Sequence, residues 1–231
     1  MDYILKQFNR PLLRFSATTD TSCPEFEILW IDLDHQHLLP LEMKLTAEGV
    51  AGWIKRRIIP KNRTNVHSLL AKCGLNLNRP MSIIEVCKGL SLNDSYWVVR
   101  EDDPSSFEEV NLYENRFSNV LARLAFTGYG SSLRSSLASS PEFTTNGMLP
   151  KCWRRINGKI YLFKGGTSGA SNTGFEPYSE FYAYQVAQAM GLNVIPYALT
   201  RWEGILCSRC ELFTSKKLSF KIGRASCRER V

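Results

Sequence analysis

Two residues in the second half of the chain have the types and the order that phosphate chemistry uses. Lys164 ends a short apolar stretch, KIYLFK, in which strand alternation places Ile160 and Leu162 on the same side as the lysine. Glu180 lies at the start of the amphipathic run that follows. Kinases pair a strand lysine with a helix glutamate in this order, because the carboxylate fixes the ammonium that binds the α- and β-phosphates. The alternatives are a solvated lysine and a glutamate that is favoured by the helix dipole.

A turn of small polar residues, TTNGMLPK, precedes the first strand of the same region. Backbone N–H groups in such a turn could face phosphate oxygens. The turn is not a Walker sequence, and it has a single glycine where the usual kinase loop has several. The sequence predicts that four residues of this turn contact a nucleotide: Thr145, Asn146, Gly147 and Met148.

Turn and cap signals predict the elements that hold these residues. Asn157-Gly158 suits a two-residue hairpin turn, so KCWRRI and KIYLFK are expected to pair as antiparallel strands. Pro177 suits a first helical turn, and a helix is expected over 178–190. Two further strands are expected on either side of Glu203-Gly204.

The first part of the chain is expected to form an accessory domain of its own. Its apolar patterns predict a small sheet between residues 3 and 43. They also predict helices over 46–59 and 65–73, a short helix closed by Gly89, and an extended segment over 94–102. An amphipathic segment over 114–126 would pack either on the second half of the chain or on a partner.

The composition is that of a globular protein. The chain has 231 residues, of which 44% are apolar and 22% are charged. No apolar run approaches the roughly 18 residues of a membrane span, so we expect a cytoplasmic protein without a membrane contact. Cys207 and Cys210 have the spacing of a metal-binding pair, but no second pair follows, and no metal site is expected.

The net charge of +7 invites an anionic partner, but part of it lies in the last residues. The final stretch, IGRASCRERV, resembles the translation of a common sequencing adapter. We therefore expect residues 221–231 to be a non-native tail.

Three stretches of the second half resemble the N-terminal lobe of HipA-like protein kinases, including the short CtkA-type members. They are NGMLPKCW, IYLFKGG and GASNTGFEPYSEFYAYQVAQAMGLNVIPYAL. The resemblance implies that Lys164 is the ATP lysine and that Glu180 is the acidic residue that opens the family's long helix. It also implies that CELFT is the hinge, which meets adenine through the backbone of three residues: Glu211, Leu212 and Phe213.

The same resemblance implies a reaction and its cofactors. A full-length member would transfer the γ-phosphoryl group of ATP, with Mg²⁺, to Ser or Thr of a protein substrate. The catalytic aspartate, the asparagine and the metal-binding aspartate of such kinases follow the hinge, where this sequence has only residues 214–220 before the tail. We therefore expect a truncated kinase that carries no catalytic residue of its own and at most binds nucleotide.

These observations together predict an α+β chain in which the kinase C-lobe is missing. The expected parts are an N-terminal accessory α/β domain, a serine-rich linker, a kinase-like N-lobe and the tail, over 1–130, 131–143, 144–220 and 221–231 respectively. The protein substrate is unknown, and a regulatory protein is a possible further partner.

The alternative is a non-enzymatic module that binds DNA or a partner through the basic helical region 44–75. Its run KRRIIPKNR could contact phosphates, and Trp53 could stack on a base. A solvated helix face and a core tryptophan are the opposing interpretations. The link that contains Pro60 is longer than a helix-turn-helix prefers, so direct nucleic-acid binding is not the favoured reading.

Overall fold

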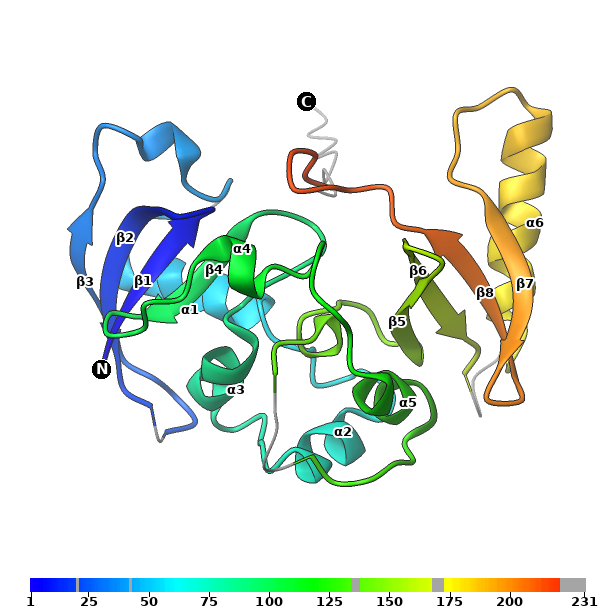
Figure 1. The fold of residues 1–231 in the computed structure, drawn as a ribbon, viewed down its shortest axis with the longest axis horizontal. Coiled ribbons are helices and arrows are strands. Elements are labelled where there is room, and N and C mark those ends of the chain that lie inside the picture. The colour runs from blue at the N-terminus through cyan, green and yellow to red at the C-terminus, as the bar shows by residue number, and fades with distance from the viewer. Residues whose placement is uncertain (20, 42, 134–137, 168–172, 221–231) are drawn as a thin grey trace, which may run out of the picture.

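Two antiparallel sheets and six α-helices make up the part of the chain that the computed structural model describes (Figure 1). That part comprises residues 1–19, 21–41, 43–133, 138–167 and 173–220. The first sheet has the strand order β3-β2-β1-β4, and the second has the order β5-β6-β8-β7. The expected α+β class is therefore confirmed.

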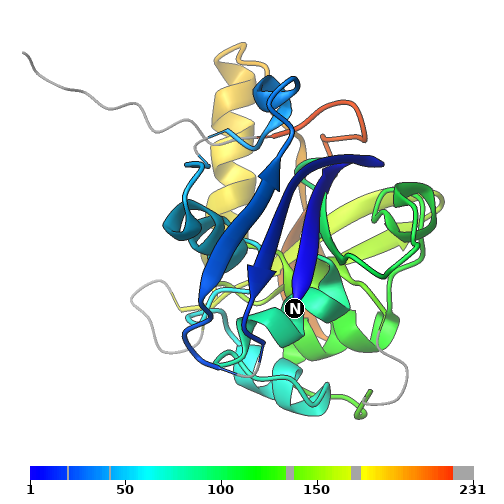
Figure 2. The same ribbon diagram turned by 90° about the vertical axis from the view of Figure 1, so that its left-hand side faces the viewer.

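The first half contains the following elements: β1 (Asp2–Gln7), β2 (Arg10–Ala17), β3 (Phe26–Ile31), the 3-10 helix η1 (Gln36–Leu38), α1 (Ala47–Arg56), α2 (Val66–Lys72), α3 (Pro80–Cys87), β4 (Tyr96–Arg100), α4 (Phe107–Val110) and α5 (Asn119–Thr127). The second half contains the following: the 3-10 helix η2 (Pro141–Phe143), β5 (Lys151–Ile156), β6 (Lys159–Gly165), α6 (Glu176–Ala189), β7 (Tyr197–Trp202) and β8 (Ile205–Glu211). Figure 2 shows the strands of the first sheet in front, with α6 on the far side of the molecule.

Helix α1 shows how the local sequence fixes an element of the first half. The hydroxyl of Thr46 accepts a hydrogen bond from the Gly49 N–H at 3.1 Å, which is the expected N-cap. The helix ends at Arg56 and not near Ile59, because the chain leaves helical geometry at Arg57. Val50 and Ile54 are buried in the main core.

The hairpin β5–β6 forms as the sequence predicts. Asn157 and Gly158 have φ values of 50° and 80°, the left-handed pair that a tight two-residue turn requires. The resulting register places Lys151 directly opposite Lys164. Because residues opposite each other in a sheet project to the same face, both lysines lie on one side of it.

Two apolar clusters join the second sheet to the first half of the chain. Ala122 and Phe126 of α5 pack against Cys152 and Phe163 of the second sheet. The amphipathic segment before residue 127 therefore docks on the second half, which was one of its two expected roles. A separate cluster joins both regions through these buried residues: Leu90, Leu92, Trp97, Val99, Phe107, Leu112, Trp153 and Ile160.

The division into four parts stays a prediction. Residues 134–137 of the expected linker and the whole expected tail, 221–231, lie outside the described residues. Within the described ranges, none of the helices is both long enough and apolar enough to cross a membrane.

Candidate functional site

The two residues singled out for phosphate chemistry lie in direct contact. Lys164, near the end of β6, donates a hydrogen bond from Nζ to Oε1 of Glu180 at 2.7 Å. The same ammonium donates to the hydroxyl of Tyr197 at 3.1 Å. The lysine and glutamate side chains are 18% and 26% exposed, so the pair is largely shielded from water while remaining reachable. The expected lysine–glutamate pairing is therefore present.

Glu180 is held from a second side. Its Oε2 accepts a hydrogen bond from the Ser208 hydroxyl at 2.5 Å, and Ser208 lies opposite Lys164 in the β6–β8 ladder. Burial opposes the charged form of Lys164, but the hydrogen bond and the charge of Glu180 outweigh it, so the pKa of the lysine is raised. The ammonium consequently stays charged at neutral pH and keeps a fixed position.

A second cation, Lys151, lies beside the pair and was missed in the sequence. It is buried, and its Nζ donates to the carbonyl oxygen of Asn146 at 2.9 Å. Burial, together with the positive charges of Arg63 and Lys164, lowers the pKa of Lys151 to about 8. A buried ammonium next to two other cations is electrostatically unfavourable, and an anion at this position would relieve the repulsion.

The predicted phosphate turn is anchored from the first half of the chain through its carbonyl groups. Arg63 donates to the carbonyl oxygens of Gly147 at 3.0 Å and of Lys151 at 3.3 Å. The N–H and the hydroxyl of Thr64 donate to the carbonyl oxygen of Met148 at 2.8 Å and 2.9 Å. Burial lowers the pKa of Arg63 to about 10, so this guanidinium remains charged in the interior.

With its carbonyl groups engaged, the turn leaves N–H groups without partners. The N–H groups of Asn146, Gly147 and Met148 donate to no acceptor within the described ranges. Gly147 has a φ of +94°, and a Cβ there would lie 2.4 Å from Nζ of Lys151. The turn therefore lies directly against the Lys151 ammonium and keeps N–H groups that are available to phosphate oxygens.

Thr145, the fourth residue predicted for the turn, has a structural contact instead. Its N–H donates to the carbonyl oxygen of Pro141 at 3.0 Å, and its hydroxyl accepts from Nε1 of Trp153 at 2.8 Å. Both groups are thereby engaged within the protein. Thr145 fixes the base of the turn, while a role in contacting nucleotide stays a prediction.

The expected hinge continues strand β8 away from the lysine pair. The N–H of Leu212 donates to the carbonyl oxygen of Ile160 at 2.8 Å, and the carboxylate of Glu211 pairs with Nζ of Lys159 at 2.9 Å in an exposed position. The N–H of Phe213 donates to no acceptor in the described part of the chain, so it is free to meet a ligand.

The hinge residues also line an open hollow of about 510 Å³ with Tyr161 and Arg209. Lys164 and Glu180 do not line this hollow. Strand alternation places Tyr161 and Arg209 on the face opposite Lys164. The predicted residues therefore form two groups, a lysine–glutamate–turn group on one face and a hinge group at the end of the sheet.

The basic region 44–75 is less available for DNA than its sequence suggests. Arg57 is buried, donates to Asp94 at 2.6 Å and stacks 4.5 Å from the ring centre of buried Trp53. Arg63 is buried under the phosphate turn. The exposed basic side chains of the run are Lys55, Arg56 and Lys61.

The described residues contain no group of three or more His, Cys, Asp or Glu side chains that could hold a metal ion. The glycine- and serine-rich segment 166–174 joins β6 to α6, and its sequence alone allows either a flap over a nucleotide or a phosphorylation site. Residues 168–172 of this segment lie outside the described residues.

Comparison with known proteins supports a fold assignment. No protein-family model and no curated protein matches the sequence. Among solved structures, the chain resembles the Shewanella oneidensis MR-1 toxin–antitoxin complex of HipA, HipB and operator DNA, with a TM-score of 0.53 and 13% sequence identity over 91% of this chain. The chain has a HipA-like fold. The match covers 50% of the solved chain, so this chain spans about half of that chain's length. The expected HipA-like architecture is confirmed, whereas the CtkA type and the truncation stay predictions.

Proposed function

We propose that this chain is the nucleotide-facing part of a HipA-like kinase that transfers the γ-phosphoryl group of ATP to Ser or Thr of a protein in the cytoplasm. The observation that carries the proposal is the pair formed by Lys164 and Glu180 at 2.7 Å. A lysine held in this way presents a positioned positive charge without having to reorganise when a phosphate arrives. The HipA-like fold supports a kinase-related function at the level of the family.

The phosphates of ATP would be held by this chain's own groups. Lys164 and Lys151 would supply the two charges, and the free N–H groups of the turn at 146–148 would donate to phosphate oxygens. A phosphate would draw the Lys151 ammonium away from the Asn146 carbonyl and lessen its repulsion with Lys164. The backbone of the hinge, residues 211–213, would face adenine.

Mg²⁺ neutralises charge on the phosphates when it is bound in kinases. Both carboxylate oxygens of Glu180 are engaged, by Lys164 and Ser208, so this residue positions the lysine and is not assigned to the metal. The groups that would accept the substrate proton and bind the metal are not assigned to any residue of this chain.

Nucleotide binding by Lys164→Met and by its matched control, Lys55→Met, tests the proposal. Lys55 is exposed on α1, so its replacement removes one charge without touching the pair at Glu180 or the hinge. Loss of a charge-assisted contact worth about 1.5–3 kcal/mol should weaken ADP binding about tenfold or more in Lys164→Met, measured by titration calorimetry. Equal ADP affinity in the two variants, or no ADP binding by the parent chain, would overturn it.

The solved relative was captured with HipB and operator DNA. By analogy we propose that a regulatory protein is a partner of this chain, with the first half as its contact region. The DNA-binding alternative for 44–75 now rests on its exposed basic side chains: Lys44, Lys55, Arg56, Lys61 and Lys72.

A further inference from the structure

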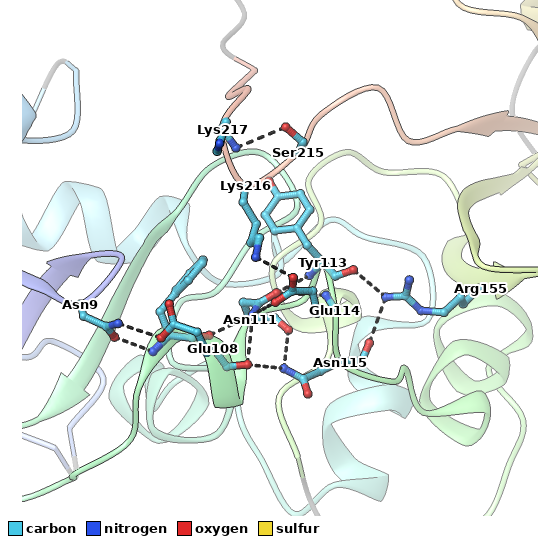
Figure 3. A network of polar contacts seen from close by, with 11 residues as sticks. Asn9, Glu108, Asn111, Tyr113, Glu114, Asn115, Arg155, Ser215, Lys216 and Lys217 are labelled. Carbon is cyan, nitrogen blue, oxygen red and sulfur yellow. Dashed lines mark hydrogen bonds and ion pairs between the residues drawn. The ribbon is translucent and has the colours of Figure 1, made fainter.

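A turn of the first half, residues 111–115, makes polar contacts with the second sheet and with the segment that follows the hinge (Figure 3). We call this turn the bracket. On one side it contacts Arg155 of strand β5, and on the other it contacts Lys216, which follows the hinge. These contacts are polar and specific in direction, unlike the apolar clusters that also join the two regions.

The shape of the bracket depends on one side chain, Asn111. The residue is fully buried, and its amide donates to the carbonyl oxygens of Phe107 at 3.0 Å and Glu108 at 3.2 Å. Its Oδ1 accepts from the N–H groups of Tyr113 at 3.1 Å and Glu114 at 3.0 Å. These hydrogen bonds of Asn111 link the end of α4 to the turn and restrain the backbone between them.

Only strand β6 lies between the residue that the bracket contacts, Arg155, and the hinge. Arg155 donates from Nη2 to the carbonyl oxygens of Tyr113 at 2.9 Å and Asn115 at 3.1 Å. Arg155 lies opposite Ile160 in the β5–β6 ladder, and the Ile160 carbonyl accepts the N–H of Leu212. A shift of the bracket would therefore be passed through a single strand to the hinge backbone.

The segment after the hinge is fastened to the same region along its length. The hydroxyl of Thr214 donates to the carbonyl oxygen of Leu92, and the N–H of Phe220 donates to that of Asn93 at 2.8 Å. Between these points, Nζ of Lys216 pairs with Oε1 of Glu114 at 2.6 Å. The first half of the chain thus forms hydrogen bonds with the beginning, the middle and the end of the segment that follows the hinge.

We propose that the bracket positions the hinge, so that the first half of the chain and the nucleotide site are energetically coupled, with Asn111 as the positioning residue. The nucleotide part of this inference rests on the proposed function. Coupling between binding sites is reciprocal. A regulatory protein that stabilises the bracket would tighten nucleotide binding, and nucleotide would tighten the contact with that protein to the same degree.

The test compares Asn111→Ala with Ser118→Ala in the full chain. Ser118 caps α5 by accepting the Leu121 N–H at 3.2 Å and touches neither the bracket nor the hinge, so its loss lowers stability without the proposed effect. The first measurement is hydrogen exchange without nucleotide at the Leu212 amide, the hinge N–H that donates to the Ile160 carbonyl oxygen, at denaturant concentrations that match the stability of the two variants. We expect this amide to exchange faster in Asn111→Ala only.

The second measurement is ADP affinity, which should fall about fivefold or more in Asn111→Ala and stay unchanged in Ser118→Ala. Asn111→Asp keeps the oxygen that accepts from Tyr113 and Glu114, and it should restore part of the hinge protection. Should Asn111→Ala fail to fold, Arg155→Met replaces it, because methionine keeps the apolar stem but has no donor for either of the two carbonyl oxygens that Nη2 contacts.

The outcomes separate the two proposals. Unchanged hinge exchange in the bracket variants, with ADP binding intact, overturns the bracket and leaves the proposed function in place. Absence of ADP binding by the parent chain overturns the proposed function, and the exchange measurement then decides on the bracket alone. Equal acceleration in Ser118→Ala also overturns the bracket, because the effect would be one of general stability.

Discussion

Replacing Lys151 with methionine tests two effects of this buried cation separately: the stability that it costs the fold and the nucleotide affinity that it is proposed to provide. The residue is 7% exposed, and burial with the charges of Arg63 and Lys164 lowers its pKa from 10.5 to about 8. Methionine keeps the apolar stem in place but removes the charge. The variant should therefore be more stable than the parent chain near neutral pH and should bind ADP more weakly.

The magnitude follows from linkage between proton binding and folding. A lowered pKa means that the unfolded chain binds more protons between pH 8 and 10.5, so the free energy of unfolding rises with pH in that window. The cost of the buried charge is fully present below pH 8 and amounts to about 3 kcal/mol at about 1.4 kcal/mol per pKa unit. Loss of the bond to the Asn146 carbonyl offsets about 1–2 kcal/mol of the gain. The free energy of unfolding of Lys151→Met should thus exceed that of the parent chain by about 1–2 kcal/mol at pH 7, and this difference should fall by about 2.5 kcal/mol on going to pH 10.

Urea unfolding at both pH values, followed by tryptophan fluorescence, measures this difference. Other titrating groups contribute equally to both proteins and cancel in the comparison. Lys159→Met removes a lysine whose pKa is raised by its hydrogen bond and ion pair with Glu211, so its difference from the parent should be small and change with pH in the opposite direction. Parallel pH dependence of Lys151→Met and the parent chain would refute the assignment of Lys151 as a buried cation held at an energetic cost.

Three further changes test other parts of the site. Gly147→Ala should lower the free energy of unfolding by about 1–2 kcal/mol through backbone strain. The loss should exceed that of Gly158→Ala, because only at Gly147 does the added Cβ meet Nζ of Lys151. Denaturant unfolding of both variants gives the difference. Trp153→Phe removes the donor to Thr145 and should lower the unfolding free energy by about 1 kcal/mol, with Trp202→Phe as the fluorescence control. Alanine at the exposed basic positions of the run 55–63, which are Lys55, Arg56 and Lys61, should leave ADP affinity unchanged. Loss of a salt-dependent affinity for duplex DNA in that variant would instead favour the DNA-binding alternative.

The lysine–glutamate pair could be predicted because each partner has a strong local signal. Alternation along KIYLFK sets the side on which Lys164 projects, and Pro177 sets where α6 begins, which places Glu180 one turn later. Lys151 had a signal that went unused. Counting outward in equal steps from the turn at Asn157-Gly158 brings Lys151 opposite Lys164.

The roles of Arg57 and Arg63 could not be predicted in the same way. Both belong to a run that looks like a solvated basic face, yet burial separates them from their exposed neighbours. Their acceptors, Asp94 and the carbonyl groups of the phosphate turn, come from distant parts of the chain. Local patterns report which face of an element is apolar, but not which remote acceptor will reach a given charge.

Helix α6 packs on strands β6, β7 and β8 through one side and is exposed on the other. Among its residues only Pro177 is fully buried, while Tyr182 and Val186 are each more than half exposed. The two hydrogen bonds of Glu180 add polar contacts between this helix and the sheet. Loss of both in Glu180→Ala should therefore register as faster amide exchange along residues 181–189.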